Sequence, residues 1–111
     1  MLRLASIRET RMGEVDAAIE IDREVLERDP DHVETLMTFG EMLRGHGRSR
    51  EAAEFHKRAA DLRTGDMRPL FALAADWNAD GNLDRAREAL ERIVAANPKR
   101  SRRARRELRD L

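Results

Sequence analysis

The sequence contains no cysteine and no tyrosine, and its aromatic residues are Trp77 and three phenylalanines. The absence of cysteine excludes disulfides, thiolate chemistry and cysteine-based metal sites, and it leaves the redox compartment open. Strand-favouring β-branched and aromatic residues are scarce, whereas alanine, leucine, arginine and glutamate predominate. The composition therefore favours an all-helical fold.

The sequence also lacks a long apolar run and a net charge. No window approaches 18 consecutive apolar residues, and charge interrupts the N-terminal stretch too early for a secretory signal, so we expect a cytoplasmic protein. Charged residues make up 40% of the 111 residues, with 22 basic and 22 acidic side chains. Such a balance is typical of a solvated helical surface rather than of a nucleic-acid-binding protein.

A period of 34 residues runs through the chain. A fixed period of this size predicts supersecondary units stacked on copies of themselves. The positions that recur at this interval, or at twice this interval, are Gly13, Gly47 and Gly81; Ala18, Ala52 and Ala86; and Pro30 and Pro98.

Each unit is expected to contain two antiparallel helices, because its apolar residues follow the three-four spacing of a helical face. Asp31 and Glu34 predict a capping box that starts a helix near His32, and Ser49 is the expected N-cap of the next helix. The recurring glycines predict the turns, and Pro69 suits a first helical turn. Small side chains at the recurring alanines would let the paired helices approach closely.

The second helices have their own expected inner faces. These are Ala18, Ile19, Ile21, Val25 and Leu26 in the first unit; Ala52, Ala53, Phe55, Ala59, Ala60 and Leu62 in the second; and Ala86, Ala89, Leu90, Ile93 and Val94 in the third.

These motifs resemble the tetratricopeptide repeat (TPR) family, whose pattern is W-x2-L-G-x2-Y…A-x3-F…P. The second unit reads Leu36-x2-Phe39-Gly40-x2-Leu43, and the third reads Leu70-x2-Leu73-Ala74-x2-Trp77. The resemblance implies an all-α, right-handed α-solenoid of antiparallel helix pairs with about seven helices. The expected repeats span residues 1–32, 33–66 and 67–98/100, and residues 99–111 form an arginine-rich capping helix.

The first unit matches the pattern poorly, since Glu9 stands at a normally apolar position. Two interpretations stay open: a terminal unit made polar for solubility, or a unit inside a longer array. The surplus apolar residues Leu2, Leu4 and Ile7 also predict self-association, most simply as a homodimer.

No constellation for catalysis or metal binding emerges from the sequence. The three histidines lack ligand spacing, and His56 is expected at the edge of the core, in place of the family's aromatic residue. Gly45-His46-Gly47-Arg48-Ser49 joins two helices, so it is interpreted as a turn rather than a phosphate-binding loop. We therefore expect no enzymatic activity, no metal and no cofactor.

The resemblance implies protein–protein interaction, with a partner peptide or helix held in a concave groove lined by the first helix of each unit. The protein would then act as an adaptor or assembly scaffold. Two alternatives are a self-association module and a binder of nucleic acid or another anionic partner through the C-terminal arginines, although no aromatic residue lies among them for base stacking. The implied groove residues are Arg3, Ile7, Glu34, Met37, Glu41, Arg44, Arg68, Phe71 and Asn78.

Overall fold

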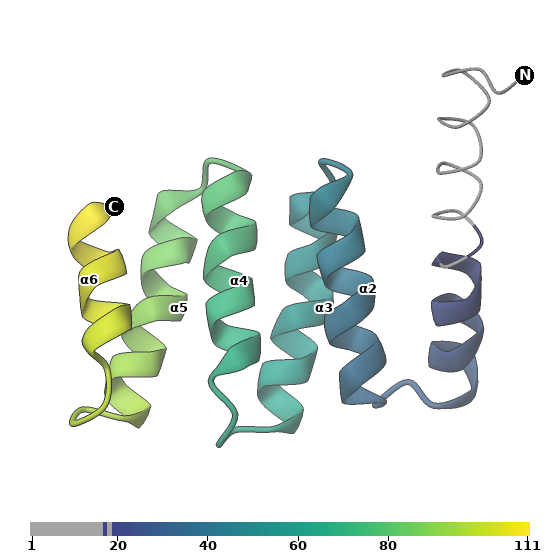
Figure 1. Cartoon of the computed structure of the whole chain (residues 1–111), viewed down its shortest axis with the longest axis horizontal. Coiled ribbons are helices and arrows are strands. Elements are labelled where there is room, and N and C mark those ends of the chain that lie inside the picture. The colour runs from purple at the N-terminus through teal and green to yellow at the C-terminus, as the bar shows by residue number, and fades with distance from the viewer. Residues whose placement is uncertain (1–16, 18) are drawn as a thin grey trace, which may run out of the picture.

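The computed structural model describes residue 17 and residues 19–111, and every regular element within them is helical (Figure 1). Residues 19–28 are helical and precede five helices with defined bounds. These helices are α2 (Val33–Gly45), α3 (Ser49–Leu62), α4 (Arg68–Ala79), α5 (Leu83–Ala96) and α6 (Arg102–Asp110).

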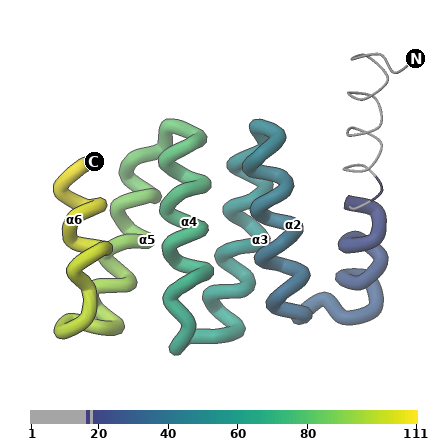
Figure 2. Tube along the Cα trace, viewed as in Figure 1, coloured from purple at the N-terminus to yellow at the C-terminus, as the bar shows by residue number. Residues whose placement is uncertain are grey.

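Consecutive helices pack against each other in a single row, which runs from residues 19–28 at one end to α6 at the other (Figure 2). The expected solenoid of antiparallel helix pairs is confirmed: α2 pairs with α3 and α4 pairs with α5. The expected first helix of the first unit, together with Gly13 and Ala18, lies outside the described residues.

Glycine closes the turn inside each of these pairs. Gly47 and Gly81 have φ angles of 76° and 83°, in the left-handed region that side chains with a Cβ avoid. After Gly47, the amide of Arg48 donates to the carbonyl of Leu43, and the amide of Asn82 donates in the same way to Trp77. The two turns predicted from the glycine spacing are therefore confirmed.

The helix starts differ from the predicted caps. His32, rather than Asp31, caps α2, because its Nδ1 accepts a 3.2 Å hydrogen bond from the amide of Thr35. Asp31 instead pairs with Arg58 at 3.3 Å. Ser49 is the first residue of α3 and is buried; the preceding Arg48 makes an ion pair with Glu51.

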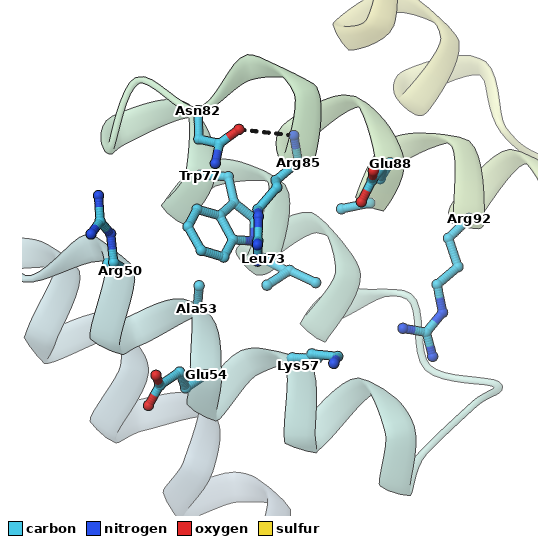
Figure 3. A pocket seen from close by; sticks show the side chains of 11 residues that line it. Arg50, Ala53, Glu54, Lys57, Leu73, Trp77, Asn82, Arg85, Glu88 and Arg92 are labelled. Carbon is cyan, nitrogen blue, oxygen red and sulfur yellow. Dashed lines mark hydrogen bonds between the residues drawn. The ribbon is translucent and has the colours of Figure 1, made fainter.

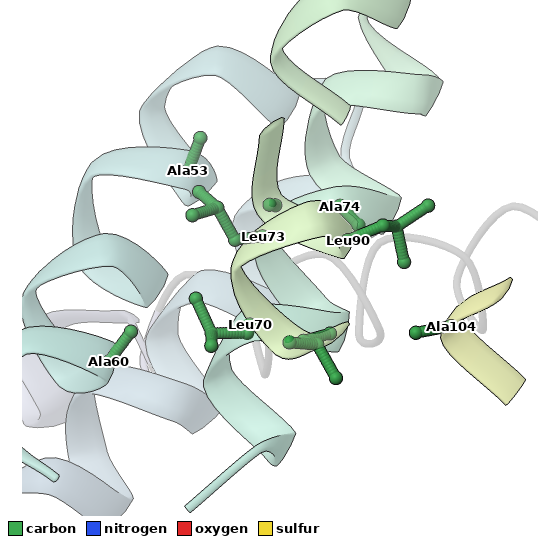
Figure 4. Close-up of a cluster of buried hydrophobic side chains, with 9 residues drawn as sticks. Ala53, Ala60, Leu70, Leu73, Ala74, Leu90 and Ala104 are labelled. Atoms are coloured by element: carbon green, nitrogen blue, oxygen red, sulfur yellow. The ribbon is translucent and has the colours of Figure 1, made fainter. Parts of the chain in front are cut away.

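The recurring alanines of the second and third units are buried within the helix pairs. Ala52 and Ala86 are both fully buried, as expected for small residues between antiparallel helices. The largest cluster of buried apolar side chains joins α3, α4, α5 and α6 (Figure 4). Two side chains assigned to inner faces were predicted wrongly, since Ile21 is 60% exposed and Leu62 is 42% exposed.

The first and second helices of the units lie on opposite sides of the row. Helices α2 and α4 contact each other directly. On the other side, a hollow of about 580 Å³ lies between α3 and α5. The first helices α2 and α4 are therefore closer together than the second helices α3 and α5. The side of the first helices is the inner, concave side of the stack.

Candidate functional site: an interaction surface and the junctions beneath it

The first helices place several of the predicted groove residues on one surface. Glu34, Glu41, Arg68 and Asn78 are exposed on α2 and α4. Arg68 reaches Glu34 at 3.3 Å, so the starts of the two helices are joined by an ion pair. These residues form a polar surface on the inner side of the stack.

Arg68 has a second carboxylate partner in Asp66, 2.7 Å from its Nη2. This hydrogen bond raises the pKa of Arg68, with Glu34 adding to the effect. It also holds the pKa of Asp66 below its ordinary value, against the opposing effect of burial. Both groups are charged at neutral pH, and the loop before α4 is fixed by their contact.

Two apolar groove residues, Met37 and Phe71, lie in the described part of the chain, and neither is fully exposed. Met37 is 9% exposed and packs with Val33, Leu36 and Ala59, so its side chain belongs to the core and is not open to a partner. The ring of Phe71 is half-buried, and the guanidinium of Arg103 on α6 lies 4.0 Å from its centroid. Phe71 is therefore only partly open to a partner in the groove.

Arg44 leads from this surface into the interior. Its side chain is 30% exposed, and its Nη1 donates to Oδ1 of Asp76 at 3.2 Å and to the carbonyl of Ala72 at 3.2 Å. Both acceptors belong to α4. Arg44 thus joins α2 to α4, and its guanidinium is already paired within the chain in the absence of a partner.

Asp76 and His56 form the buried part of this network. Both side chains have no exposed surface, and Nδ1 of His56 contacts Oδ2 of Asp76. The other ring nitrogen, Nε2, lies 3.3 Å from the carbonyl oxygen of Met37. Because buried polar groups are costly without partners, this network fixes α2, α3 and α4 in one register.

The position of His56 differs from the expected one. It lies inside the core rather than at its edge, and a missing side chain makes room for it: a Cβ built on Gly40 would approach Nε2 of His56 to 2.5 Å. Gly40 is therefore required for close packing, not for an unusual backbone angle. The sequence analysis did not identify Asp76. The available signal was His56 itself, because a polar residue at a position that is normally aromatic needs a polar partner in the core.

The network of Arg44, His56 and Asp76 lies at the junction between the second and third units. The next junction, between the third unit and α6, has different residue types at the corresponding positions. The residues 34 positions after Arg44, His56 and Asp76 are Asn78, Leu90 and Asp110. All three line an open hollow of about 330 Å³ between α4, α5 and α6. The polar network of the first junction is replaced by a partly apolar recess.

The hollow of about 580 Å³ on the outer side lies between α3 and α5 (Figure 3). Trp77 and Leu73 of α4 lie in its lining, and the guanidinium of Arg85 is stacked 4.8 Å from the ring centroid of Trp77. At the preceding junction, Phe55 packs edge-on against Phe39 at 4.7 Å and leaves about 240 Å³. Ala89 stands 34 residues after Phe55, and this smaller side chain leaves the larger hollow open.

No group of three or more metal-ligating side chains occurs in the described part of the chain. Within the same residues, no helix combines the length and the apolar character needed to cross a membrane. The groove residues Arg3 and Ile7 lie outside the described residues.

Comparison with known proteins supports the fold. No known protein family matches the chain by sequence profile, and no curated protein matches it. Among solved structures, the crystal structure of MamA is similar, with a TM-score of 0.69 and 28% identity over 88% of this chain. The chain spans 57% of that MamA chain. The fold is a TPR-like α-solenoid.

Proposed function

We propose that the chain is a non-catalytic interaction module that binds a partner peptide or helix along the inner side of α2 and α4. The observation that carries this proposal is the set of exposed polar side chains on the two first helices, which are Glu34, Glu41, Arg68 and Asn78. Their buried faces are occupied by core packing, and their junction is fixed internally by Arg44 and Asp76. The exposed positions can therefore contact a partner without dismantling the stack.

The chemistry of this surface favours a polar partner segment. Glu34 and Arg68 lie at one end of the helices, and Glu41 and Asn78 lie nearer the other end. Oppositely charged groups with fixed positions supply register and specificity more than raw affinity. The partly buried ring of Phe71 adds one apolar contact between them.

A selected peptide would test the groove. A random peptide library would be panned against the full chain, and the peptides recovered would be measured by titration calorimetry. An Ala75→Trp variant places a bulky ring on the exposed face of α4, and Arg87→Ala changes an exposed residue of α5. We expect at least a tenfold weaker peptide affinity for Ala75→Trp and unchanged affinity for Arg87→Ala. Equal affinity for both variants and the unaltered chain would refute binding in the groove.

This proposal includes three further expectations. The repeats span residues 1–32, 33–66 and 67–98/100, residues 99–111 act as a cap, and the protein is cytoplasmic. Helices α2 and α3 fall within the second span, and α4 and α5 fall within the third. One face of α6 packs on the third repeat, where Ala104 is fully buried. This packing supports the proposed capping role.

A further inference from the structure

The two ends of the described stack carry opposite charge. Residues 19–32 contain six carboxylates and two arginines, for a net charge of −4, whereas residues 98–111 contain seven basic and two acidic residues, for a net charge of +5. Residues 33–97 between them have a net charge of −1. The two charged segments lie at opposite ends of the row of helices (Figure 1).

The charges of each end follow one helical stripe. Glu20, Glu24 and Glu27 are exposed and have the i, i+4, i+7 spacing of a single helix face. Arg102, Arg106 and Arg109 are exposed on α6 with the same spacing. We call these the acidic stripe and the basic stripe. Carboxylates and guanidiniums with matching spacing can pair over two helical turns.

Few of these charges are neutralised inside the described structure. Glu20 makes a long ion pair of 3.7 Å with Arg23, and Glu24 and Glu27 have no ion-pair partner among the described residues. The three arginines of the basic stripe likewise have none there, since the ion pair of α6 joins Arg103 to Glu107. Within residues 19–111, both stripes therefore have charged groups left over for a second molecule.

An apolar side chain accompanies the acidic stripe. Ile21 is 60% exposed beside Glu20 and Glu24. The long arginine side chains of α6 offer aliphatic stems that can cover such a residue while their charged ends reach carboxylates. The contact would combine modest apolar burial with guanidinium–carboxylate pairs, which predicts weak and salt-sensitive association.

We infer that the acidic stripe of one copy docks against the basic stripe of a second copy, so that the chain associates head to tail. The two stripes are different surfaces, so the contact is heterologous and leaves an unused stripe at each end of every pair. Association therefore continues beyond two copies rather than closing as the two-fold homodimer expected from Leu2, Leu4 and Ile7. This inference is independent of the groove proposal.

Charge reversal tests the pairing directly. The tail variant carries Arg102→Glu, Arg106→Glu and Arg109→Glu, and the head variant carries Glu20→Arg, Glu24→Arg and Glu27→Arg. A matched control, Glu54→Arg with Glu88→Arg and Glu91→Arg, has the same net charge as the head variant but changes exposed residues of α3 and α5. Circular dichroism would confirm that each variant keeps its helix content.

Sedimentation velocity over a concentration series would give the result. At about 50 mM salt we expect the unaltered chain to exceed twice its 12.8 kDa monomer mass and to return to the monomer at about 500 mM salt. The tail and head variants should each be monomeric, and the control should associate like the unaltered chain. Mixing the tail and head variants should restore association beyond two copies, because each reversed stripe then meets its complement.

Three results would overturn the inference. The first is a monomeric unaltered chain at low salt, and the second is a mass that stops at two copies. The third is association that survives in the head and tail variants alone. A short DNA duplex serves as a separate probe: binding that the tail variant loses, by a chain that does not self-associate, would assign the basic stripe to nucleic acid and contradict the pairing.

Discussion

The junction between the second and third units and the junction between the third unit and α6 share their backbone plan but not their chemistry. In the first junction, Arg44, Asp76 and His56 form a closed polar network with no exposed surface on the latter two side chains. In the second, the residues 34 positions later surround an open hollow of about 330 Å³. A repeat backbone thus tolerates either a buried polar network or an open, partly apolar recess at the same place.

The comparison also separates geometric from chemical requirements. Ala52 and Ala86 are identical and fully buried in their helix pairs, because close approach of two helices demands a small residue whatever the junction contains. Gly40 and Ala74 differ, because only the first junction must admit an imidazole ring. We call the junction with the buried polar network the closed junction and the junction with the hollow the open junction. Substitutions at the closed junction are therefore expected to destabilise the chain more than those at the open junction.

The largest effect is expected from His56→Leu, which gives the closed junction the residue found at position 90. The change leaves Oδ2 of Asp76 buried without its hydrogen-bond partner, and an unpaired buried polar group costs up to about 3 kcal/mol. Urea unfolding would measure the loss. Leu90 is 2% exposed but borders the open hollow, so the imidazole of the mirror variant Leu90→His can turn toward that hollow and should cost less. Equal costs would mean that the two junctions do not differ.

Gly40→Ala should have the next largest effect. The added Cβ would lie 2.5 Å from Nε2 of His56, and the ring cannot move without breaking its contact with Asp76. Overpacking of this kind costs about 2 kcal/mol. Gly45→Ala is the matched control within α2, since nothing lies within 4 Å of its Cβ position. Thermal unfolding should show a lower Tm for Gly40→Ala and an unchanged or higher Tm for Gly45→Ala; the reverse order would contradict the packing described.

The recurring alanines offer a finer comparison. Ala52→Leu inserts three carbons into a closed interface beside Phe39 and Leu43, and it should destabilise the chain by about 2 kcal/mol. Ala86 lines the open hollow, so Ala86→Leu can direct part of its side chain there and should cost less. Parallel urea titrations would decide the order. A larger cost at position 86 would show that the hollow offers no room.

The smallest effect concerns Asp22, which is 34 residues before His56. Its Oδ2 is buried with no hydrogen-bond partner in the described part of the chain, and burial raises its pKa above the ordinary value of 3.8. A raised carboxyl pKa means that the ionised form destabilises the fold at neutral pH, and this cost disappears as the pH falls and the group is protonated. Asp22→Leu should therefore raise stability by about 0.5 kcal/mol at pH 7.

The pH dependence provides the control for that variant. The gain from Asp22→Leu should shrink as the pH falls through the raised pKa of the folded chain, and it should be lost below about pH 3, where the carboxyl is neutral in both the folded and the unfolded chain. Melting curves of both chains at several pH values would show the difference. A gain that does not change with pH would mean that apolar packing alone, rather than ionisation, causes it.

The sequence predicts the solenoid because its period is carried by residues with local physical requirements. Gly47 and Gly81 supply left-handed turns, and Ala52 and Ala86 allow close helix packing. Caps are harder to predict, because several neighbouring side chains can serve: His32 caps α2 although Asp31 and Glu34 fit the expected motif. Asp31 and Glu34 instead find arginine partners far away in the sequence.

The candidate surface is less predictable than the fold. Exposure at a given repeat position depends on the neighbouring element, and a period cannot supply that information. Phe71 is covered by Arg103 of α6, and Met37 is enclosed by core residues of its own unit. The outer hollow follows from the difference between Phe55 and Ala89 at one repeat position, and it can be recognised once the units are aligned.

The most direct test of the closed polar junction is a double-mutant cycle between His56 and Asp76. The free energy of unfolding would be measured for the unaltered chain, His56→Leu, Asp76→Leu and the double variant. The account predicts that each single change is strongly destabilising and that the double variant recovers much of the loss, with a coupling energy of about 2 kcal/mol. Additive costs, with no coupling between the two positions, would contradict it.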